Sequence, residues 1–546
     1  MKKNEHVFGV CSGYTSDGHG VVKIDGFPLF VKGMMNKESG ELVVTLVKKS
    51  YGFARLLKLD KVNEERVSPA CPIAKQCGGC QLQHMSYKEQ LAFKKQKVQD
   101  VIERIAKLNV QVEDVLGMAQ PDHYRNKGQI PVGVVKGQIV TGFYRINSNT
   151  IIDTDSCGIQ SEKINAVLQT MRSLFKKYGN AGVFRHLLIK HAFATGEVMV
   201  VWIVRQKKFA HREEMVQELV KRMPEIKSVV LNLNTREDNV ILGKQEEVLY
   251  GESFITDEIN GLKFHISAKS FYQVNPVQTK VLYGKALEFC NLKGNETVID
   301  LYCGVGTISM FLAQKAGKVI GIEIVEQAVR DARENAALNG LDNVEFVCSD
   351  AAAYAKEMSE QGGRADVVVV DPPRKGCDQV TLDSIVQMAP ERLVYVSCDP
   401  ATLARDLRIL EGKGYRVEVV QPVDMFPGTH HVETVVLLSH KKADSYIHID
   451  VEFGEGEGKI PVDSIAKRAE AYKPKEKVTY KMIKEYIEAK YGFKVHTAYI
   501  AEVKRDLGLP MYDAPNAVEE LKQPRKHPTP EKVEAIKDAL RYFAVI

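Results

Sequence analysis

Apolar and polar positions divide the chain into four segments. Residues 1–62 contain short alternating stretches with a turn signal about every 8–12 residues, which predicts a small five-stranded β-barrel. Residues 68–260 mix strand-like and helix-like runs and predict an α+β domain. In residues 261–441, five apolar runs alternate with helical segments, which is typical of a doubly wound α/β domain with buried parallel strands. Residues 445–546 predict a helical extension, because prolines divide short helix-like pieces there.

The extension is expected to contain at least two helices. Thr479 and Thr497 are in position to cap them, and Gly492 is in position to end the first. Two short helices across a tight turn are compatible with a helix-turn-helix, but a structural helical hairpin is the more frequent arrangement.

Composition and charge exclude several classes of protein. The 546 residues are 44% hydrophobic, 27% charged and 8% aromatic, as in an ordinary globular protein. The longest apolar run, Val198–Val204, is far shorter than the ~20 residues of a membrane-spanning helix. The start of the chain lacks the apolar stretch of a signal peptide, so we expect a cytoplasmic protein. The net charge of +5 permits a polyanionic partner without requiring one.

In the predicted barrel, cationic and aromatic residues are interleaved. Such a pattern suits RNA, because bases stack on rings while cations hold phosphates, although a solvated barrel face has a similar composition. The residues concerned are Tyr14, Phe27, Phe30, Lys32, Lys48, Lys49, Tyr51, Phe53 and Arg55.

Ten cysteines are too few for a disulfide scaffold in a chain of this length, so metal binding and catalysis are the better explanations. Cys71, Cys77 and Cys80 form a compact C-x5-C-x2-C group that needs a fourth ligand. Cys157 is the best candidate for that ligand, because Cys11 lies in the predicted barrel. The spacing alone does not distinguish a zinc ion from an iron–sulfur cluster.

A strand-turn-helix segment at residues 298–307 has the features of a nucleoside site. Gly304 and Gly306 let the backbone approach a ligand closely. Glu323 ends the next predicted strand, where a carboxylate can accept both ribose hydroxyls. The third glycine of the dinucleotide pattern is absent, which favours S-adenosylmethionine over NAD.

Three more strand ends carry reactive side chains. Asp371 and Cys398 follow apolar strands, and Glu433 begins one. Pro400 can start a helix after Cys398, and its N-terminal amides are expected to favour the thiolate. Burial is expected to raise the pKa of Glu433 toward that of a useful base. Attack of a thiolate on carbon 6 of an unstacked uracil would let carbon 5 accept a methyl group, after which the carboxylate would remove the carbon-5 proton.

The motifs DLYCGVG, DPPRKG, VYVSCDPATLARDL and HHVETVVLL occur in that order. Together they resemble those of the RNA (uracil-5-)-methyltransferase family, and the resemblance covers about residues 1–440. It implies a Rossmann-like class I methyltransferase domain with Cys398 as nucleophile and Glu433 as base. It also implies contacts to S-adenosyl-L-methionine from Gln273, Tyr302, Glu323 and Asp371.

The branch of that family acting on ribosomal RNA has an N-terminal RNA-binding barrel of the TRAM type and a 4Fe-4S cluster with this cysteine pattern. The resemblance therefore implies a 4Fe-4S cluster on Cys71, Cys77, Cys80 and Cys157, with a structural role. It also implies 23S ribosomal RNA, or an assembling large subunit, as the substrate.

Three alternatives stay open at this stage. The same chemistry on transfer RNA is one, and a non-catalytic iron–sulfur RNA-binding protein is another. An adenine amino-methyltransferase is the third, but it would need an aromatic residue after the two prolines, where this chain has Arg374. The extension departs from the family, and its stretch 467–494, with nine lysines and arginines against four glutamates, is expected to add affinity for RNA.

Overall fold

The computed structural model describes residues 1–440, 480–507 and 528–542. The chain divides into two compact units, Met1–Ser445 and Tyr446–Ile546. Within the described ranges, none of the helices combines the length and the apolar character needed to cross a membrane.

The N-terminal segment forms the small barrel that the sequence predicts. Its strands close in the order β1-β2-β3-β5-β4, and only the β3–β5 pair is parallel. Alternate side chains such as Val22, Leu29 and Leu42 fill the interior. The strands are β1 (His6–Tyr14), β2 (Gly20–Ile24), β3 (Phe27–Val31), β4 (Ser39–Val47) and β5 (Gly52–Lys61).

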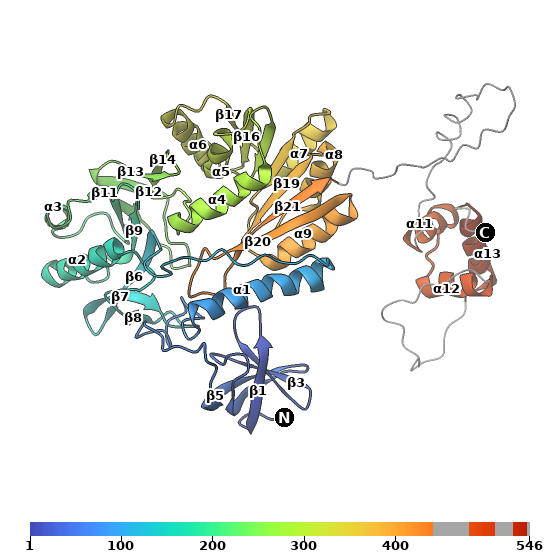
Figure 1. The fold of residues 1–546 in the computed structure, drawn as a ribbon, viewed down its shortest axis with the longest axis horizontal. Helices are drawn as coiled ribbons and strands as arrows, with labels where there is room; N and C mark the ends of the chain where they lie inside the picture. The colour runs from blue at the N-terminus through green and yellow to red at the C-terminus, as the bar shows by residue number, and fades with distance from the viewer. Residues whose placement is uncertain (441–479, 508–527, 543–546) are drawn as a thin grey trace. The chain divides into compact units, whose positions relative to one another are not determined.

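A long helix follows the barrel. Helix α1 (Tyr87–Val101) starts at the cap Ser86, continues as a π-helical turn over Ile102–Ala106, and ends at Lys107 with φ of 61°. Figure 1 shows α1 beside α9 (Pro400–Gly412) and β20 (Tyr415–Val423) of the later α/β domain, and the three elements are in contact. Helix α1 lies in the central region of the sequence, but it packs against the α/β domain.

The central region contains a seven-stranded mixed sheet in the order β12-β11-β10-β9-β6-β7-β8. Helices α2 and α3 pack on one face of it, over a core that includes Leu168, Trp202 and Leu219. The elements are β6 (Lys127–Val135), β7 (Gln138–Tyr144), β8 (Ile151–Asp153), α2 (Glu162–Tyr178), β9 (Phe184–His191), β10 (Val198–Val204), α3 (Arg212–Arg222), β11 (Ile226–Leu233) and β12 (Gln245–Gly251).

The α/β domain has a seven-stranded sheet in the order β17-β16-β15-β18-β19-β21-β20, preceded by the hairpin β13 (Phe254–Ile259) and β14 (Leu262–Ser267). The five strands β15 to β19 are parallel, and β21 is antiparallel to both of its neighbours. The strands are β15 (Thr297–Leu301), β16 (Lys318–Glu323), β17 (Val344–Cys348), β18 (Val367–Val370), β19 (Arg392–Ser397), β20 (Tyr415–Val423) and β21 (Glu433–His440).

Helices cover both faces of this sheet, as in a doubly wound domain. Leu282, Phe311 and Val329 from α4, α5 and α6 pack on one face, where Val298 of β15 also points. Leu382 and Leu407 from α8 and α9 pack with α7 on the other face. The helices are α4 (Pro276–Cys290), α5 (Thr307–Ala313), α6 (Glu326–Leu338), α7 (Ala351–Glu360), α8 (Gln379–Met388) and α9 (Pro400–Gly412).

The second unit contains three described helices, α11 (Tyr480–Tyr491), α12 (Thr497–Asp506) and α13 (Pro530–Tyr542). They enclose a core of their own that includes Ile487, Ile500 and Ile536, so the expected hairpin is completed by a third helix. Gly492, with φ of 73°, follows α11 as expected.

One expected cap in this unit is wrong. The N-cap of α12 is His496 and not Thr497, because the His496 backbone is extended and its ring nitrogen accepts a hydrogen bond from the amide of Ala498. Thr479 and the part of the basic stretch at 467–479 lie outside the described residues.

Replacing Ile487 by alanine should destabilise the second unit by about 2–5 kcal/mol, because a fully buried side chain leaves its core. Since the core of Met1–Ser445 is separate, its unfolding transition is expected to stay in place. Calorimetry measures the unfolding transitions, and hydrogen exchange assigns each of them to one of the two units. An equal shift of both transitions would contradict two separate cores.

Candidate active site

The side chains that the sequence singles out lie at one edge of the α/β sheet. Tyr302 directly follows β15, Glu323 ends β16, Asp371 follows β18 and Cys398 follows β19. Because parallel strands bring their carboxyl ends to the same edge, these four side chains share one site. Glu433 begins the antiparallel strand β21 and so reaches the same edge from the opposite direction.

Two carboxyl groups at this edge hold their protons unusually tightly. Glu433 is 5% exposed, and burial, together with the charge of Asp371, raises its pKa to about 8. Asp371 keeps part of its surface exposed, yet burial of its carboxyl raises the pKa to about 7. The expectation that burial raises the pKa of Glu433 is confirmed, and the group can exchange a proton near neutral pH.

Cys398 is half-buried and faces both carboxyl groups. Burial, then the charges of Glu433 and Asp371, raise the pKa of its thiol to about 11, while Arg374 lowers it. A thiolate is therefore disfavoured at Cys398, contrary to the expectation from the helix amides. Burial is the largest cause, and the charges of Glu433 and Asp371 add to it.

The amides at the start of α9 already have a partner. The side chain of Asp399 caps the helix by accepting hydrogen bonds from the amides of Ala401 (2.9 Å) and Thr402 (3.2 Å). Pro400 occupies the first turn, as expected. The positive end of the helix is thus balanced by a carboxylate next to Cys398 and not by the thiolate.

The loop after β15 is shaped for a close approach of a ligand. Gly306 has φ of 78°, and a Cβ there would lie 2.5 Å from the ring of Phe346, so only glycine fits. Tyr302 also has a positive φ, 71°. Glu323 is fixed beside this loop, because its two oxygens accept the amides of Gly304 (3.1 Å) and Val325 (2.8 Å).

Gln273 joins the site from the loop before α4. Its carbonyl accepts a hydrogen bond from the Asn126 side chain (2.9 Å), and Gln273 itself is hydrogen-bonded to Tyr283. Tyr283 is buried, and the charges of Asp371 and Glu433 help to raise its pKa. The sequence analysis missed Tyr283, because a tyrosine among the apolar positions of α4 has the pattern of a core residue.

Asp300 is a second residue that the sequence analysis did not single out. It is fully buried in β15, accepts a hydrogen bond from Ser309 Oγ (2.5 Å), and its Oδ1 has no partner within the described chain. Burial raises its pKa to about 7, and the nearby charges of Asp371 and Glu323 act in the same direction. An acidic residue inside the apolar strand TVIDL was the available signal.

The four expected metal ligands lie around one cavity of about 210 Å³. Cys71, Cys77 and Cys80 come from the loop before α1, and Cys157 comes from the loop before α2. Burial raises the pKa of Cys80 to about 12, and the other three thiols add to the shift. In the part of the chain that is described, no group of three or more His, Cys, Asp or Glu side chains is arranged to hold a metal ion.

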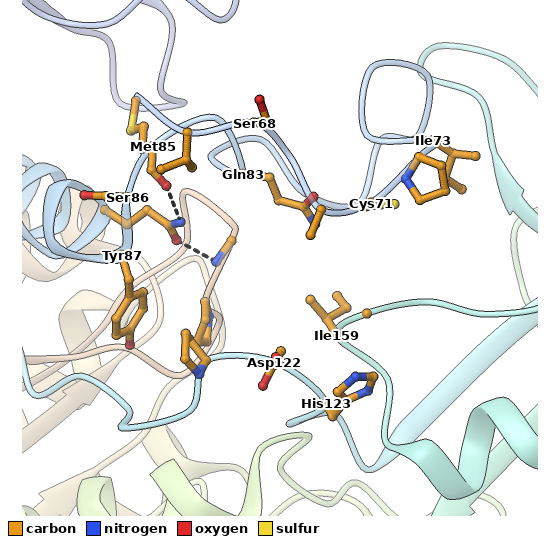
Figure 2. A pocket seen from close by; sticks show the side chains of 18 of the residues that line it. Ser68, Cys71, Ile73, Gln83, Met85, Ser86, Tyr87, Asp122, His123 and Ile159 are labelled. Atoms are coloured by element: carbon orange, nitrogen blue, oxygen red, sulfur yellow. Dashed lines mark hydrogen bonds between the residues drawn. The ribbon is translucent and has the colours of Figure 1, made fainter. Parts of the chain in front are cut away.

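Two of the residues that line the cavity between the four cysteines each have a buried polar atom without a hydrogen-bond partner in the described chain. Arg125 Nε and Gln160 Oε1 are buried and find no hydrogen-bond partner among the described residues. A second cavity, of about 620 Å³, shares Cys71 with the first. Figure 2 shows Cys71 across this second cavity from Asp122 and His123.

The sequence profile described as tRNA (Uracil-5-)-methyltransferase matches residues 86–441. An uncharacterized RNA methyltransferase of Halalkalibacterium halodurans is 49% identical over 450 residues, which are 81% of this chain and 98% of that protein. One from Clostridium tetani is 47% identical over 448 residues, 81% of this chain and 97% of that protein.

Among solved structures, the chain is similar to Pyrococcus abyssi tRNA (uracil-54, C5)-methyltransferase in complex with S-adenosyl-L-homocysteine. The TM-score is 0.64 and the identity 27%, and the match covers 79% of this chain and 99% of the other.

The Glu433→Gln variant should be more stable than the wild-type protein at pH 8 and about equally stable at pH 4.5. The folded protein keeps the Glu433 proton up to about pH 8, whereas the unfolded chain loses it near 4.5. Wild-type stability therefore falls as the pH rises between these values, by on the order of 1 kcal/mol per pH unit.

Denaturant unfolding at the two pH values measures this difference, with Glu334→Gln on the exposed face of α6 as the matched control. If the free energy of unfolding changes equally between the two pH values in wild type and in Glu433→Gln, the Glu433 carboxyl is not held protonated.

Proposed function

The chain belongs to the tRNA (uracil-5-)-methyltransferase family, and on this basis we propose that it methylates carbon 5 of a uridine in 23S ribosomal RNA. The family consists of S-adenosylmethionine-dependent RNA methyltransferases, and the α/β domain has the class I methyltransferase fold. The observation that carries the proposal is the meeting of Cys398, Asp371 and Glu433 at one sheet edge.

In the proposed reaction, the Cys398 thiol first gives its proton to solvent. Its Sγ then forms a bond to carbon 6 of the flipped uracil, and the ring becomes an enolate that is nucleophilic at carbon 5. Bound S-adenosylmethionine supplies the methyl group and a positive charge near the thiol. Glu433 in its ionised form then takes the proton from carbon 5, the electrons of that carbon–hydrogen bond form the carbon 5–carbon 6 double bond, and the electron pair of the carbon 6–sulfur bond returns to Cys398. A carboxyl with a pKa of about 8 can hold that proton and release it again.

The cofactor is proposed to lie across the carboxyl ends of β15, β16 and β18. The two amides that hold Glu323 leave each carboxylate oxygen a lone pair for a ribose hydroxyl. Tyr302, Gln273 and Asp371 are the further proposed contacts, and Tyr283 orients Gln273 among them.

A uridine in transfer RNA is the second candidate substrate, because the similar Pyrococcus abyssi enzyme acts on transfer RNA. We favour ribosomal RNA, because the barrel and the C-x5-C-x2-C group resemble those of the family branch that acts on ribosomal RNA. The match to the Pyrococcus abyssi enzyme covers 79% of this chain, so the substrate is decided by experiment. The barrel is proposed as a TRAM-type RNA-binding domain. Its Phe30, Tyr51 and Phe53 rings pack at centroid distances of 5.3–5.8 Å and offer a stacking surface beside lysines.

Incubation with S-adenosylmethionine and unmodified 23S RNA containing 5-fluorouridine should give a covalent protein–RNA complex that survives denaturation. Fluorine at carbon 5 cannot leave as a proton, so the Cys398 adduct is trapped. Cys398→Ala should form no complex, and Cys348→Ala should behave as the wild type. An adduct with transfer RNA alone would overturn the ribosomal substrate, and none with either RNA would contradict the mechanism.

The four cysteines are proposed to hold a 4Fe-4S cluster with a structural role. A zinc ion would need four sulfurs about 3.8 Å apart, given a Zn–S distance of 2.3 Å. The four cysteines line one cavity of about 210 Å³, which has room for a cluster of several atoms. The unpaired Arg125 Nε and the Lys127 side chain in the cavity wall fit an anionic group with sulfur acceptors.

Protein purified without oxygen should contain about four iron atoms and four sulfides per chain, with the broad visible absorption of a cluster. Cys157→Ser should lose most of the iron, because it removes the ligand that closes the set. Cys348→Ser, on the exposed end of β17, is the matched control and should keep it. Stoichiometric zinc in the wild type, or equal iron in both variants, would contradict the cluster.

A further inference from the structure

One face of α1 carries a row of polar side chains that do not face solvent freely. Tyr87, Gln90, Lys94 and Lys97 follow one another at steps of three or four residues, so they lie along a single helix face. All four contact the segment 424–430, which connects β20 to β21. A polar row of this kind normally faces water, and here it faces protein.

The strongest contact in this row is a buried ion pair. Lys94 Nζ donates to Asp424 Oδ1 at 2.5 Å, and both side chains are fully buried. Lys94 also donates to the carbonyl of Phe426 (3.0 Å), and Tyr87 donates to the second oxygen of Asp424 (2.9 Å). The first residue of the connection is therefore fixed by charge as well as by hydrogen bonds.

The remaining members of the row hold the connection further along. Gln90 accepts the amide of Gly428 (2.8 Å) and donates to the carbonyl of Met85 (3.1 Å), and Figure 2 draws both bonds beside the larger cavity. Lys97 Nζ donates to the carbonyl of His430 (2.8 Å). Residues 424 to 430 are thus tied to α1 over their whole length.

Other segments also form hydrogen bonds to the connection between β20 and β21. Side chains or amides from the loop before α1, from the loop before β6 and from the start of α4 donate to four more of its carbonyls. The bonds run from Gln278 to Asp424 O (3.1 Å), from Asn275 to Met425 O (3.1 Å), from Tyr124 to Pro427 O (3.0 Å) and from Leu82 N to Gly428 O (2.9 Å).

The connection ends at the residue that the proposed reaction uses as its base. Val423 and Glu433 are paired across β20 and β21, so the nine residues between them form the closed end of a hairpin. A displacement of this end moves the first residue of β21 directly. Cys398 stands on a different strand, β19, and Asp399 caps its helix α9. The row reaches this side of the site through Lys97, whose amine interacts with the charge of Asp399, whereas its hydrogen bond goes to the hairpin end.

We propose that the polar face of α1, formed by Tyr87, Gln90, Lys94 and Lys97, positions Glu433 for the second half of the methylation. This inference rests on the proposed function. In that half, the carbon 5–hydrogen bond breaks, the proton passes to Glu433, the carbon 6–sulfur bond breaks and its electron pair returns to Cys398. The four residues act through the hairpin end and are positioning residues.

The test is a single-turnover reaction with unsubstituted uridine RNA in which adduct formation and product release are timed separately. In Lys97→Met, the denaturation-resistant adduct should form at about the wild-type rate and then break down about tenfold more slowly, because one hydrogen bond to the hairpin end is lost. Lys97→Arg keeps a donor and should restore release. Lys95→Met, whose amine contacts Asp114 outside the row, should match the wild type.

A second variant tests the ion pair without leaving a buried charge. Lys94→Met combined with Asp424→Leu removes both partners, and an apolar pair in place of a buried ion pair usually keeps the fold. It should accumulate the methylated adduct as Lys97→Met does, which a general loss of structure would not produce.

The following results would overturn the inference. If Lys97→Met slows adduct formation and release equally, or releases product as fast as the wild type, the row does not position Glu433. If Glu433→Gln accumulates the adduct and neither row variant does, the proposed reaction stands and this inference fails. Absence of any adduct in the wild type would instead overturn the proposed function, and the inference with it.

Discussion

The ion pair of Lys94 and Asp424 lies fully buried between the helix after the barrel and the last hairpin of the α/β domain. Burying two charges is costly, and removal of one partner from such a pair costs about 3–5 kcal/mol. The protein meets this constraint with extra hydrogen bonds from Tyr87 and to Phe426. The position of α1, and through it the hairpin end that leads to Glu433, depends on keeping both charges satisfied.

At the sheet edge, burial outweighs the nearby cation, Arg374. Asp300, Asp371 and Glu433 all have raised pKa values, chiefly because they are buried, and the charge of Asp371 adds to the shift at Asp300 and Glu433. Such clusters lower stability near neutral pH and are typical of functional sites. The same carboxylates oppose the Cys398 thiolate, so a bound cation has a large effect on this thiol.

Local patterns in the sequence were sufficient for the barrel, the doubly wound sheet and the strand ends at which Asp371, Cys398 and Glu433 stand. They failed where a property depends on distant segments. The pKa of Cys398 is set by burial in the folded site and by carboxylates from two other strand ends, and the row on α1 has the same polar spacing as a solvated helix. Tyr283 looked like a core residue for the same reason, because nothing near it in the sequence indicates Gln273 as its partner.

The separation of Lys94 from Asp424 along the chain has a consequence for biosynthesis. The two residues are 330 positions apart, so at ~5–20 residues per second the ribosome needs roughly 15–65 s to make the partner of a lysine that has already emerged. During that interval the Lys94 amine has no partner. The buried ion pair, and with it the packing of α1 on the last hairpin, can therefore form only after almost all of residues 1–440 have been made.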